Sequence, residues 1–546
     1  MSKTRLLALV LIMILICGLL GACGTAGEKE PADTPAETPS TEEPAGEEKQ
    51  AAEEPEPDID ISEFVEISNY VLGDPPANDM VDKMLEQLNP ILKEKINAHM
   101  RVEWIEWADY LTKYNLLLAS GQEIDMIHAS STWLDFWPNV QKGSFLALDD
   151  LIPKYAPKTW AEIPQEDWEQ CKYQGKIYCF PENSYTQYVN HGIFYRGDWL
   201  KEFGMEPVKN FEEMGEYFKK VKEVYGPQGV IPFDAHNGMS LWEGYIISNT
   251  DYVDVRVNTG RHKVLWGKSF EEPFELVAPV FEDLFVEYAK MMKDWDEAGV
   301  WRKDVLNFEG DTRANLRAGQ SASDQHHSNT YRYLRVEMDE LIPGSDLQMF
   351  AWCDTRGNLV AEPITHGATA IGRTSKHPER TVMLYELFRQ DEEIYRLINY
   401  GIEGVSYVIN EEGKLDRPEG FDSARDGFSI NWWGGRVDKF ELRQAWEWEP
   451  IWDIWAEYDK IVKKPFPYGR FVLDRTPIEA ELSAISEVTN QYGPMIDFGK
   501  VDDPEKEVED YRNKLKAAGF DKVMHEIGNQ LAAYKEQIGE WPPASN

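Results

Sequence analysis

The sequence predicts an α/β fold in which helices cover a parallel sheet. Strand-like alternation and helix-like spacing of the apolar residues take turns along the chain, at 64–73, 79–100, 101–107, 108–122 and 123–130. Pro90 is expected to interrupt the first helical segment, because proline lacks the N–H of a helical hydrogen bond. Strands that alternate with helices typically form parallel sheets. In such sheets ligands bind beyond the carboxyl ends of the strands, so we expect a site after "VEISNY" and after "DMI".

The N-terminus predicts export and a lipid anchor. Lys3 and Arg5 precede a largely apolar run that is long enough for a signal peptide but short for a membrane span. The sequence "LGAC" ending at Cys23 resembles the lipobox of bacterial lipoproteins, which makes 1–22 a signal peptide and Cys23 an acylated first residue. An uncleaved anchor with an incidental cysteine is the alternative. Residues 23–62, rich in Pro, Glu, Ala and Thr, are expected to form a disordered acidic stalk.

Composition narrows the class of ligand. The formal net charge is −41, from 97 acidic and 56 basic residues, which disfavours nucleic acid and anionic lipid as partners. Aromatic residues make up 12% of the chain, with 19 Trp. Most must pack in cores, but an excess of indole rings also suits a cleft that stacks on sugar rings.

The cysteines form no metal pattern. The segment "CKYQGKIYC" predicts a hairpin centred on 174–176 that brings Cys171 opposite Cys179. Outside the cell such a pair can oxidise to a disulfide; two buried, reduced thiols are the equal alternative.

Several ordered segments together resemble a known family. They are "YNLLLASGQEIDMI", "VQKGSFLALDDLIPKYAP", "YQGKIYCFPENS", "IFYRGDWLKEFGMEPVKNFEEM", "NLRAGQSASDQHH" and "GATAIGRTSKHPERTVMLYELF". In this order and spacing they resemble the extracellular solute-binding proteins of ABC importers, in the carbohydrate-binding family typified by maltose-binding protein. The large lipoprotein members of Gram-positive bacteria are the most similar.

The resemblance implies a two-lobed periplasmic-binding-protein-like fold of type II, with discontinuous lobes joined by a hinge. The first lobe is expected to comprise 63–185 and 360–403, and the second 186–359 and 404–546. It also implies ligand contacts in the loops at the mouth of the cleft. The residues carried over in this way are Tyr70, Ser131, Trp133, Asn183, Tyr185, His236, Asn237, Trp242, Asp324, His326 and His327. Composition alone, without a family match, adds Trp432 or Trp433 as a stacking platform.

Catalytic signatures are incomplete. Gly319 to Ser323 lacks the closing glycine of a nucleophile elbow, and His525-Glu526 lacks the second histidine of a zinc-protease helix. The adjacent pair His326-His327 is a poor metal grip, because neighbouring side chains on regular structure point apart. No catalysis, metal or cofactor is therefore expected, although counting carboxylates cannot exclude a glycoside hydrolase.

The sequence thus predicts a monomeric receptor, anchored by lipid on the extracellular face of the cell membrane of a Gram-positive bacterium. It would capture a soluble oligosaccharide and deliver it to ABC permease subunits. The alternatives are a glycoside hydrolase, a glycan-binding adhesin, or the same fold with a peptide or charged-sugar ligand.

Overall fold

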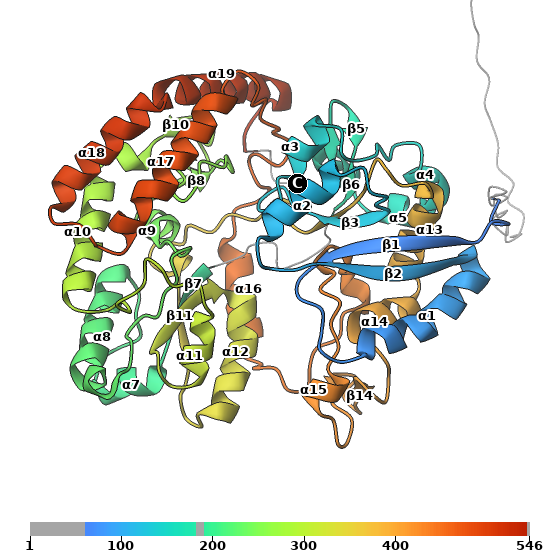
Figure 1. Cartoon of the computed structure of the whole chain (residues 1–546), viewed down its shortest axis with the longest axis horizontal. Coiled ribbons are helices and arrows are strands. Elements are labelled where there is room, and N and C mark those ends of the chain that lie inside the picture. The colour runs from blue at the N-terminus through green and yellow to red at the C-terminus, as the bar shows by residue number, and fades with distance from the viewer. Residues whose placement is uncertain (1–59, 182–190, 543–546) are drawn as a thin grey trace, which may run out of the picture. The chain divides into compact units, whose positions relative to one another are not determined.

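The computed structural model describes residues 60–181 and 191–542. Its contacts divide the chain into Met1–Asp58 and Ile59–Asn546, and every element below belongs to the second unit. This unit contains two α/β lobes, each built around its own sheet and hydrophobic core (Figure 1). Among the described residues, no helix has the length and apolar character needed to cross a bilayer.

The first lobe is organised by a five-stranded sheet of order β2-β1-β3-β13-β6. Its strands are β1 (Val65–Leu72), β2 (Ala98–Ile105), β3 (Met126–Ala129), β6 (Cys179–Phe180) and β13 (Ala368–Ile371). The first three are parallel, as the alternation of strands and helices predicts. β13 comes from much later in the chain and runs antiparallel to both β3 and β6, so the sheet is mixed rather than wholly parallel.

Helices flank this sheet. They are α1 (Met80–Ile96), α2 (Tyr110–Ala119), α3 (Phe136–Gln141), α4 (Ile152–Tyr155), α5 (Pro157–Glu162), α6 (Gln165–Gln170), α13 (Pro378–Gln390) and α14 (Glu392–Tyr400). The expected interruption at Pro90 is wrong, because α1 continues through it. Met84, Leu88 and Leu92 form one fully buried face of α1, and packing of that face compensates for the hydrogen bond that proline cannot make.

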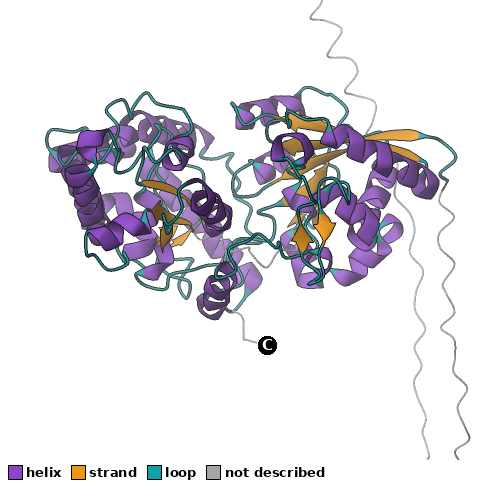
Figure 2. Ribbon diagram, turned by 90° about the horizontal axis from the view of Figure 1, so that it is seen from below, coloured by secondary structure: helices purple, strands orange, loops and turns teal. Residues whose placement is uncertain are grey.

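The second lobe has a small antiparallel sheet surrounded by helices (Figure 2). The sheet has the order β11-β7-β12, with β7 at His191–Tyr195, β11 at Ser323–His327 and β12 at Gln348–Ala351. The longer helices are α8 (Phe211–Val224), α9 (Trp242–Asn249), α10 (Asp283–Glu297), α12 (Ser328–Leu341), α16 (Ile451–Ile461), α17 (Glu479–Asp497), α18 (Pro504–Ala517) and α19 (Phe520–Ile538). In the register of this sheet, His191 lies directly opposite His327.

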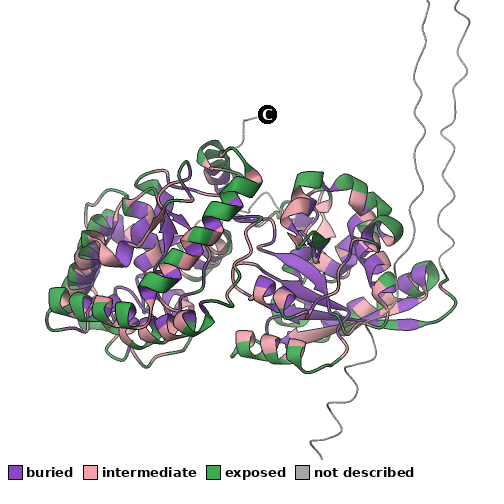
Figure 3. Ribbon diagram, turned by 90° about the horizontal axis from the view of Figure 1, so that it is seen from above, coloured by how far each residue is buried: buried purple, intermediate pink, exposed green. Residues whose placement is uncertain are grey.

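Each lobe is discontinuous in sequence. The buried residues of the first core come from 65–180, 368–398 and 430–437, and those of the large second core from 193–352 and 466–534. Figure 3 shows the buried strands enclosed by helices that are exposed on their outer faces. Ile430, Trp432 and Val437 pack in the first core, whereas the sequence places everything after 403 in the second lobe. The first core therefore includes residues from 430–437, beyond the boundary expected from the sequence.

The cysteine hairpin forms, with β4 (Lys172–Tyr173) paired to β5 (Lys176–Ile177). Its two-residue turn uses Gln174 and Gly175, both at positive φ, as a tight hairpin requires. Cys171 and Cys179 are buried free thiols, so the structure contains the reduced alternative rather than the disulfide. Burial, reinforced by a hydrogen bond with Cys179, raises the pKa of Cys171.

Candidate functional site

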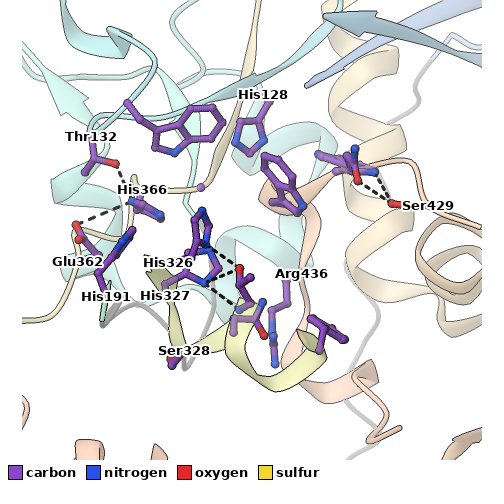
Figure 4. Close-up of a pocket in the computed structure, with 18 of the residues that line it drawn as sticks. His128, Thr132, His191, His326, His327, Ser328, Glu362, His366, Ser429 and Arg436 are labelled. Carbon is purple, nitrogen blue, oxygen red and sulfur yellow. Dashed lines mark hydrogen bonds and ion pairs between the residues drawn. The ribbon is translucent and has the colours of Figure 1, made fainter. Parts of the chain in front are cut away.

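A cavity of about 1450 Å³ lies where the strand ends of the two lobes approach each other. Trp107 follows β2, His128 lies in β3 and Trp133 follows β3, so the first lobe contributes the carboxyl ends of its parallel strands. The second lobe contributes His191 from β7 and His327 from β11. The cavity therefore occupies the position that the sheet topology predicts for a ligand (Figure 4).

The first lobe presents a cluster of rings to this cavity, which we call the aromatic wall. Its members are Trp107, Tyr110, His128, Trp133 and Trp433. The Trp107 and Trp433 rings are stacked, with centroids 5.4 Å apart and an interplanar angle of 19°. Trp107 is 40% exposed and Trp433 41% exposed, which is unusual for such large apolar side chains. Their exposed faces are available to an apolar ligand surface.

The two adjacent tryptophans have different environments. Trp432 is buried, packs against Phe388 in a tilted arrangement with centroids 4.2 Å apart, and donates its indole N–H to Thr369 Oγ1 at 3.0 Å. Trp433 points the other way and contacts the rings of Trp107, His128 and Trp133. Of the two candidates for a stacking platform, only Trp433 presents an exposed ring to the cavity.

His128 is the buried polar residue of the aromatic wall. Its side chain is almost wholly covered, and neither ring nitrogen has a hydrogen-bond partner within the described parts of the chain. Burial, together with nearby His366, lowers its pKa to about 3, so the ring is neutral at physiological pH. A buried polar group without a partner costs on the order of 1–3 kcal/mol. Such a group is suited to a ligand that supplies the missing bonds.

The second lobe contributes three histidines to the opposite wall, which we call the histidine cluster: His191, His326 and His327. Their ring centroids lie 4.2 to 5.6 Å apart. The backbone N–H of Thr330 donates to His327 Nδ1 at 3.2 Å, which places the proton of the neutral His327 ring on Nε2. Burial lowers the pKa of both His326 and His327 to about 3. The cluster therefore presents neutral donors and acceptors.

Charged residues of the same wall pair with one another and with Glu362, which lies on the segment that crosses between the lobes. This ion network consists of Glu243, Asp254, Arg256, Lys263 and Glu362. Lys263 Nζ lies 2.6 Å from Asp254 and 2.7 Å from Glu243. Arg256 pairs with Asp254 at 3.3 Å and also with Glu362. Burial lowers the pKa of Arg256, but the carboxylates of Glu362 and Asp254 outweigh it and raise that pKa overall.

The segment that crosses between the lobes near Glu362 contacts the first lobe directly. Ser131 Oγ lies 2.7 Å from Thr365 Oγ1, and Thr132 Oγ1 lies 2.7 Å from His366 Nδ1. These contacts join the loop after β3 to the crossing segment. Ser131 lines a second, smaller cavity of about 330 Å³ on this side of the structure.

The predicted site residues lie in different parts of the structure. Ser131 lines the smaller cavity and not the large one. Trp133, His326, His327, Trp432 and Trp433 line the large cavity. Tyr70, His236, Asn237, Trp242 and Asp324 do not. Asn183, Tyr185 and Cys23 lie outside the described residues.

The residues away from the cavity have structural partners. Trp242 is 1% exposed and packs in the second core against Phe285 and Tyr288, so its ring is not available for stacking on a ligand. Asp324 is buried and accepts hydrogen bonds from Arg313 and Thr312. Tyr70 OH accepts a hydrogen bond from Gln122 at 2.6 Å. These three side chains are therefore engaged within the protein, by ring packing or by hydrogen bonds.

Sequence reasoning missed Trp107, His128, His191 and the ion network. Trp107 and His128 lie at the carboxyl ends of β2 and β3, so the rule on strand ends could have found them. Arg256 and Glu362 are far apart in sequence and meet only through the fold.

The lining carboxylates are each engaged. Glu243, Asp254 and Glu362 belong to the ion network, and Glu441 accepts a hydrogen bond from Tyr395 OH. Among the residues that the structure describes, no three His, Cys, Asp or Glu side chains are placed to hold a metal ion. The arrangement favours binding over acid–base chemistry.

Comparison with known proteins identifies the family. Residues 81–379 match the family model of bacterial extracellular solute-binding proteins, and residues 467–536 match a domain of unknown function. The chain belongs to the bacterial extracellular solute-binding proteins. A carbohydrate ABC transporter substrate-binding protein of Streptococcus pneumoniae is 24% identical over 473 residues, which cover 85% of this chain and 90% of that protein.

Solved structures share the fold. The N-glycan transport solute binding protein of Streptococcus pneumoniae, in complex with Man1GlcNAc, gives a TM-score of 0.68 at 20% identity, covering 86% of this chain and 100% of that one. The S. pneumoniae substrate binding protein FusA, in complex with kestose, gives 0.61 at 16% identity, with 86% and 100% covered. The expected two-lobed type II fold is confirmed, and the family is one of binding proteins rather than a known class of enzyme.

Proposed function

We propose that this chain is the receptor of an ABC importer and that it binds a neutral oligosaccharide in the large cavity. The aromatic wall carries this proposal, because exposed indole rings that face a cavity suit the apolar faces of sugar rings. The volume of about 1450 Å³ exceeds the roughly 300–1,000 Å³ typical of small-molecule pockets, which favours a ligand of several rings.

The polar side chains support the same ligand class. Neutral histidines both donate and accept hydrogen bonds, as sugar hydroxyls do. The charged side chains of the ion network are paired with one another, which leaves little of their charge for a ligand. The glycan-binding relatives named above support a sugar as well.

Lobe closure would present the loaded receptor to a permease. We assign residues 63–185 and 360–437 to the first lobe. Residues 186–359 and the chain after Val437 belong to the second. A ligand that contacts both walls would favour the closed state through its additional contacts there. Acylation of Cys23 would hold the receptor on the extracellular face of the membrane, and the receptor would act as a monomer without catalysis.

Calorimetry of the purified chain against a panel of neutral oligosaccharides tests this proposal. We expect binding at one site, and a gain of about 2.7 kcal/mol in the free energy of unfolding at a ligand concentration of 100 Kd. Products of glycan cleavage in the same mixtures would instead support a glycoside hydrolase. Binding of peptides alone would contradict the sugar assignment.

A further inference from the structure

Trp433 occupies the place that a ligand ring would take on Trp107. The two indoles are nearly parallel, at 19°, with centroids 5.4 Å apart. Stacking of this kind is the contact that Trp107 would offer to the flat face of a sugar ring. In this structure the protein's own indole makes that contact.

The backbone that carries Trp433 is fixed on both sides. Trp432 is anchored in the first core through Phe388 and Thr369. Gly434 lies so close to β13 that an added Cβ would be 2.6 Å from the carbonyl oxygen of Ala368. The carbonyl of Gly434 also accepts a hydrogen bond from Thr369 Oγ1 at 3.2 Å. Movement of the Trp433 ring therefore requires only side-chain rotation, and the loop can stay in place.

The Trp433 ring also covers His128. The two rings meet edge to face, with centroids 5.7 Å apart, and the centroid of the Trp133 ring lies 5.4 Å from that of His128. Among the described residues, the Trp433 side chain has ring contacts and no hydrogen bond that would hold it there. Within the described residues, neither nitrogen of His128 has a hydrogen-bond partner beneath this cover.

We propose that Trp433 is a displaceable plug over a saccharide subsite formed by Trp107, His128 and Trp133. When the plug swings away, a pyranose ring stacks on Trp107 and its hydroxyls bond to His128. A neutral imidazole needs one donor and one acceptor, and hydroxyl groups supply both, whereas a carboxylate only accepts and an ammonium only donates. The subsite therefore selects an uncharged, hydroxyl-bearing ring. The assignment of a sugar ligand rests on the proposed function.

The first test uses the Trp433→Ala variant of the full chain, with a sugar that binds the wild-type chain. Removing the plug should tighten binding about 2- to 10-fold, because the ligand no longer displaces an aromatic pair. Weaker binding by the variant would overturn the proposal and would identify Trp433 as a platform. Trp433→Leu serves as a second variant if the alanine variant unfolds more easily.

The second test needs no ligand and follows the ring of His128 by NMR during a pH titration. Burial lowers the pKa of His128 to about 3, with His366 as a second cause, and removal of Trp433 should let water reach the ring and raise that pKa toward 6.5. Trp446→Ala is the matched control, since Trp446 lines the same cavity but makes no ring contact with His128; it should leave the pKa of His128 unchanged.

The two tests separate the two ideas. If no sugar binds the wild-type chain, the proposed function fails, and the titration still decides whether Trp433 covers His128. An unchanged pKa of His128 in Trp433→Ala would overturn the plug even where sugars bind well.

Discussion

The two walls of the cavity use their side chains in opposite ways. The aromatic wall of the first lobe leaves large faces of Trp107 and Trp433 exposed. The opposite wall contains an ion network in which Arg256 and Lys263 are paired with three carboxylates. The aromatic wall leaves ring faces available to a ligand. In the ion network, the charged groups are paired with one another within the protein.

This difference separates affinity from stability. The exposed ring of Trp107 loses little when the ligand is absent, so its removal should mainly weaken binding, whereas removal of the plug Trp433 should strengthen it. Buried ion pairs depend on each other, and removing one partner leaves a charge in a poorly solvated place. We therefore expect substitutions in the aromatic wall to change Kd and substitutions in the ion network to change folding.

The largest effect should come from Arg256→Met. This variant removes the cationic partner of Glu362, which is only 9% exposed. The free energy of unfolding should fall by about 3 kcal/mol at neutral pH. Chemical denaturation measures this change, and Lys460→Met is the control, because its pair with Glu457 is exposed and should be worth less than about 1 kcal/mol.

The loss in Arg256→Met should also depend on pH with a definite sign. Burial raises the pKa of Glu362 even though Arg256 opposes it, and removal of Arg256 should raise that pKa further. A carboxyl with a raised pKa in the folded state contributes stability below its unfolded pKa, near 4.3, and loses it as the pH rises. The variant should therefore be closest to wild type near pH 4.5. A loss that grows on acidification would contradict this account.

The next largest effect should come from Trp107→Ala. Loss of the stacking surface should weaken oligosaccharide binding about 10- to 30-fold, the cost of truncating an aromatic anchor at the centre of a site. The free energy of unfolding should change much less, because the ring is 40% exposed. Calorimetry and denaturation of the same sample give both quantities.

Leu116→Ala is the control for this substitution. Leu116 lies on the same lobe, is 65% exposed and does not line the cavity. It should change neither quantity appreciably. Equal losses of affinity in both variants would mean that the aromatic wall is not the binding surface.

The fold was predictable from local patterns to a large extent. The periodicities give β1, α1, β2, α2 and β3 in order, because each is a continuous run with a clear buried face. Periodicity could not predict that β13 runs antiparallel, or that Ile430 and Trp432 pack in the first core. Both depend on contacts between segments far apart in the chain.

The candidate site was predictable where a strand ends in the cavity. Trp133 follows β3, and His326 and His327 end β11, so the order of elements is enough to place them. Trp242 does not line the cavity, because a resemblance in the order of segments does not distinguish a buried ring from an exposed one. His128 was missed because its distinguishing property, a buried ring without a hydrogen-bond partner in the described parts of the chain, exists only in the folded structure.

The smallest effect should come from His326→Asn in the histidine cluster. Asparagine keeps a donor and an acceptor, so oligosaccharide affinity should fall only about 2- to 5-fold, within the range of one neutral hydrogen bond. Burial, with His191 as the next cause, lowers the pKa of His326 to about 3. The affinity of the wild-type chain should therefore be constant from pH 5 to 8, and a step near pH 6.5 would show that a charged histidine takes part. The stability of the two chains should depend on pH in different ways. A histidine whose pKa is lowered in the folded state costs stability as the pH falls below its unfolded pKa, near 6.5. The free energy of unfolding of His326→Asn should therefore fall less than that of the wild-type chain between pH 7 and 4. His525→Asn, on an exposed position of α19 that does not line the cavity, is the control and should leave oligosaccharide affinity unchanged.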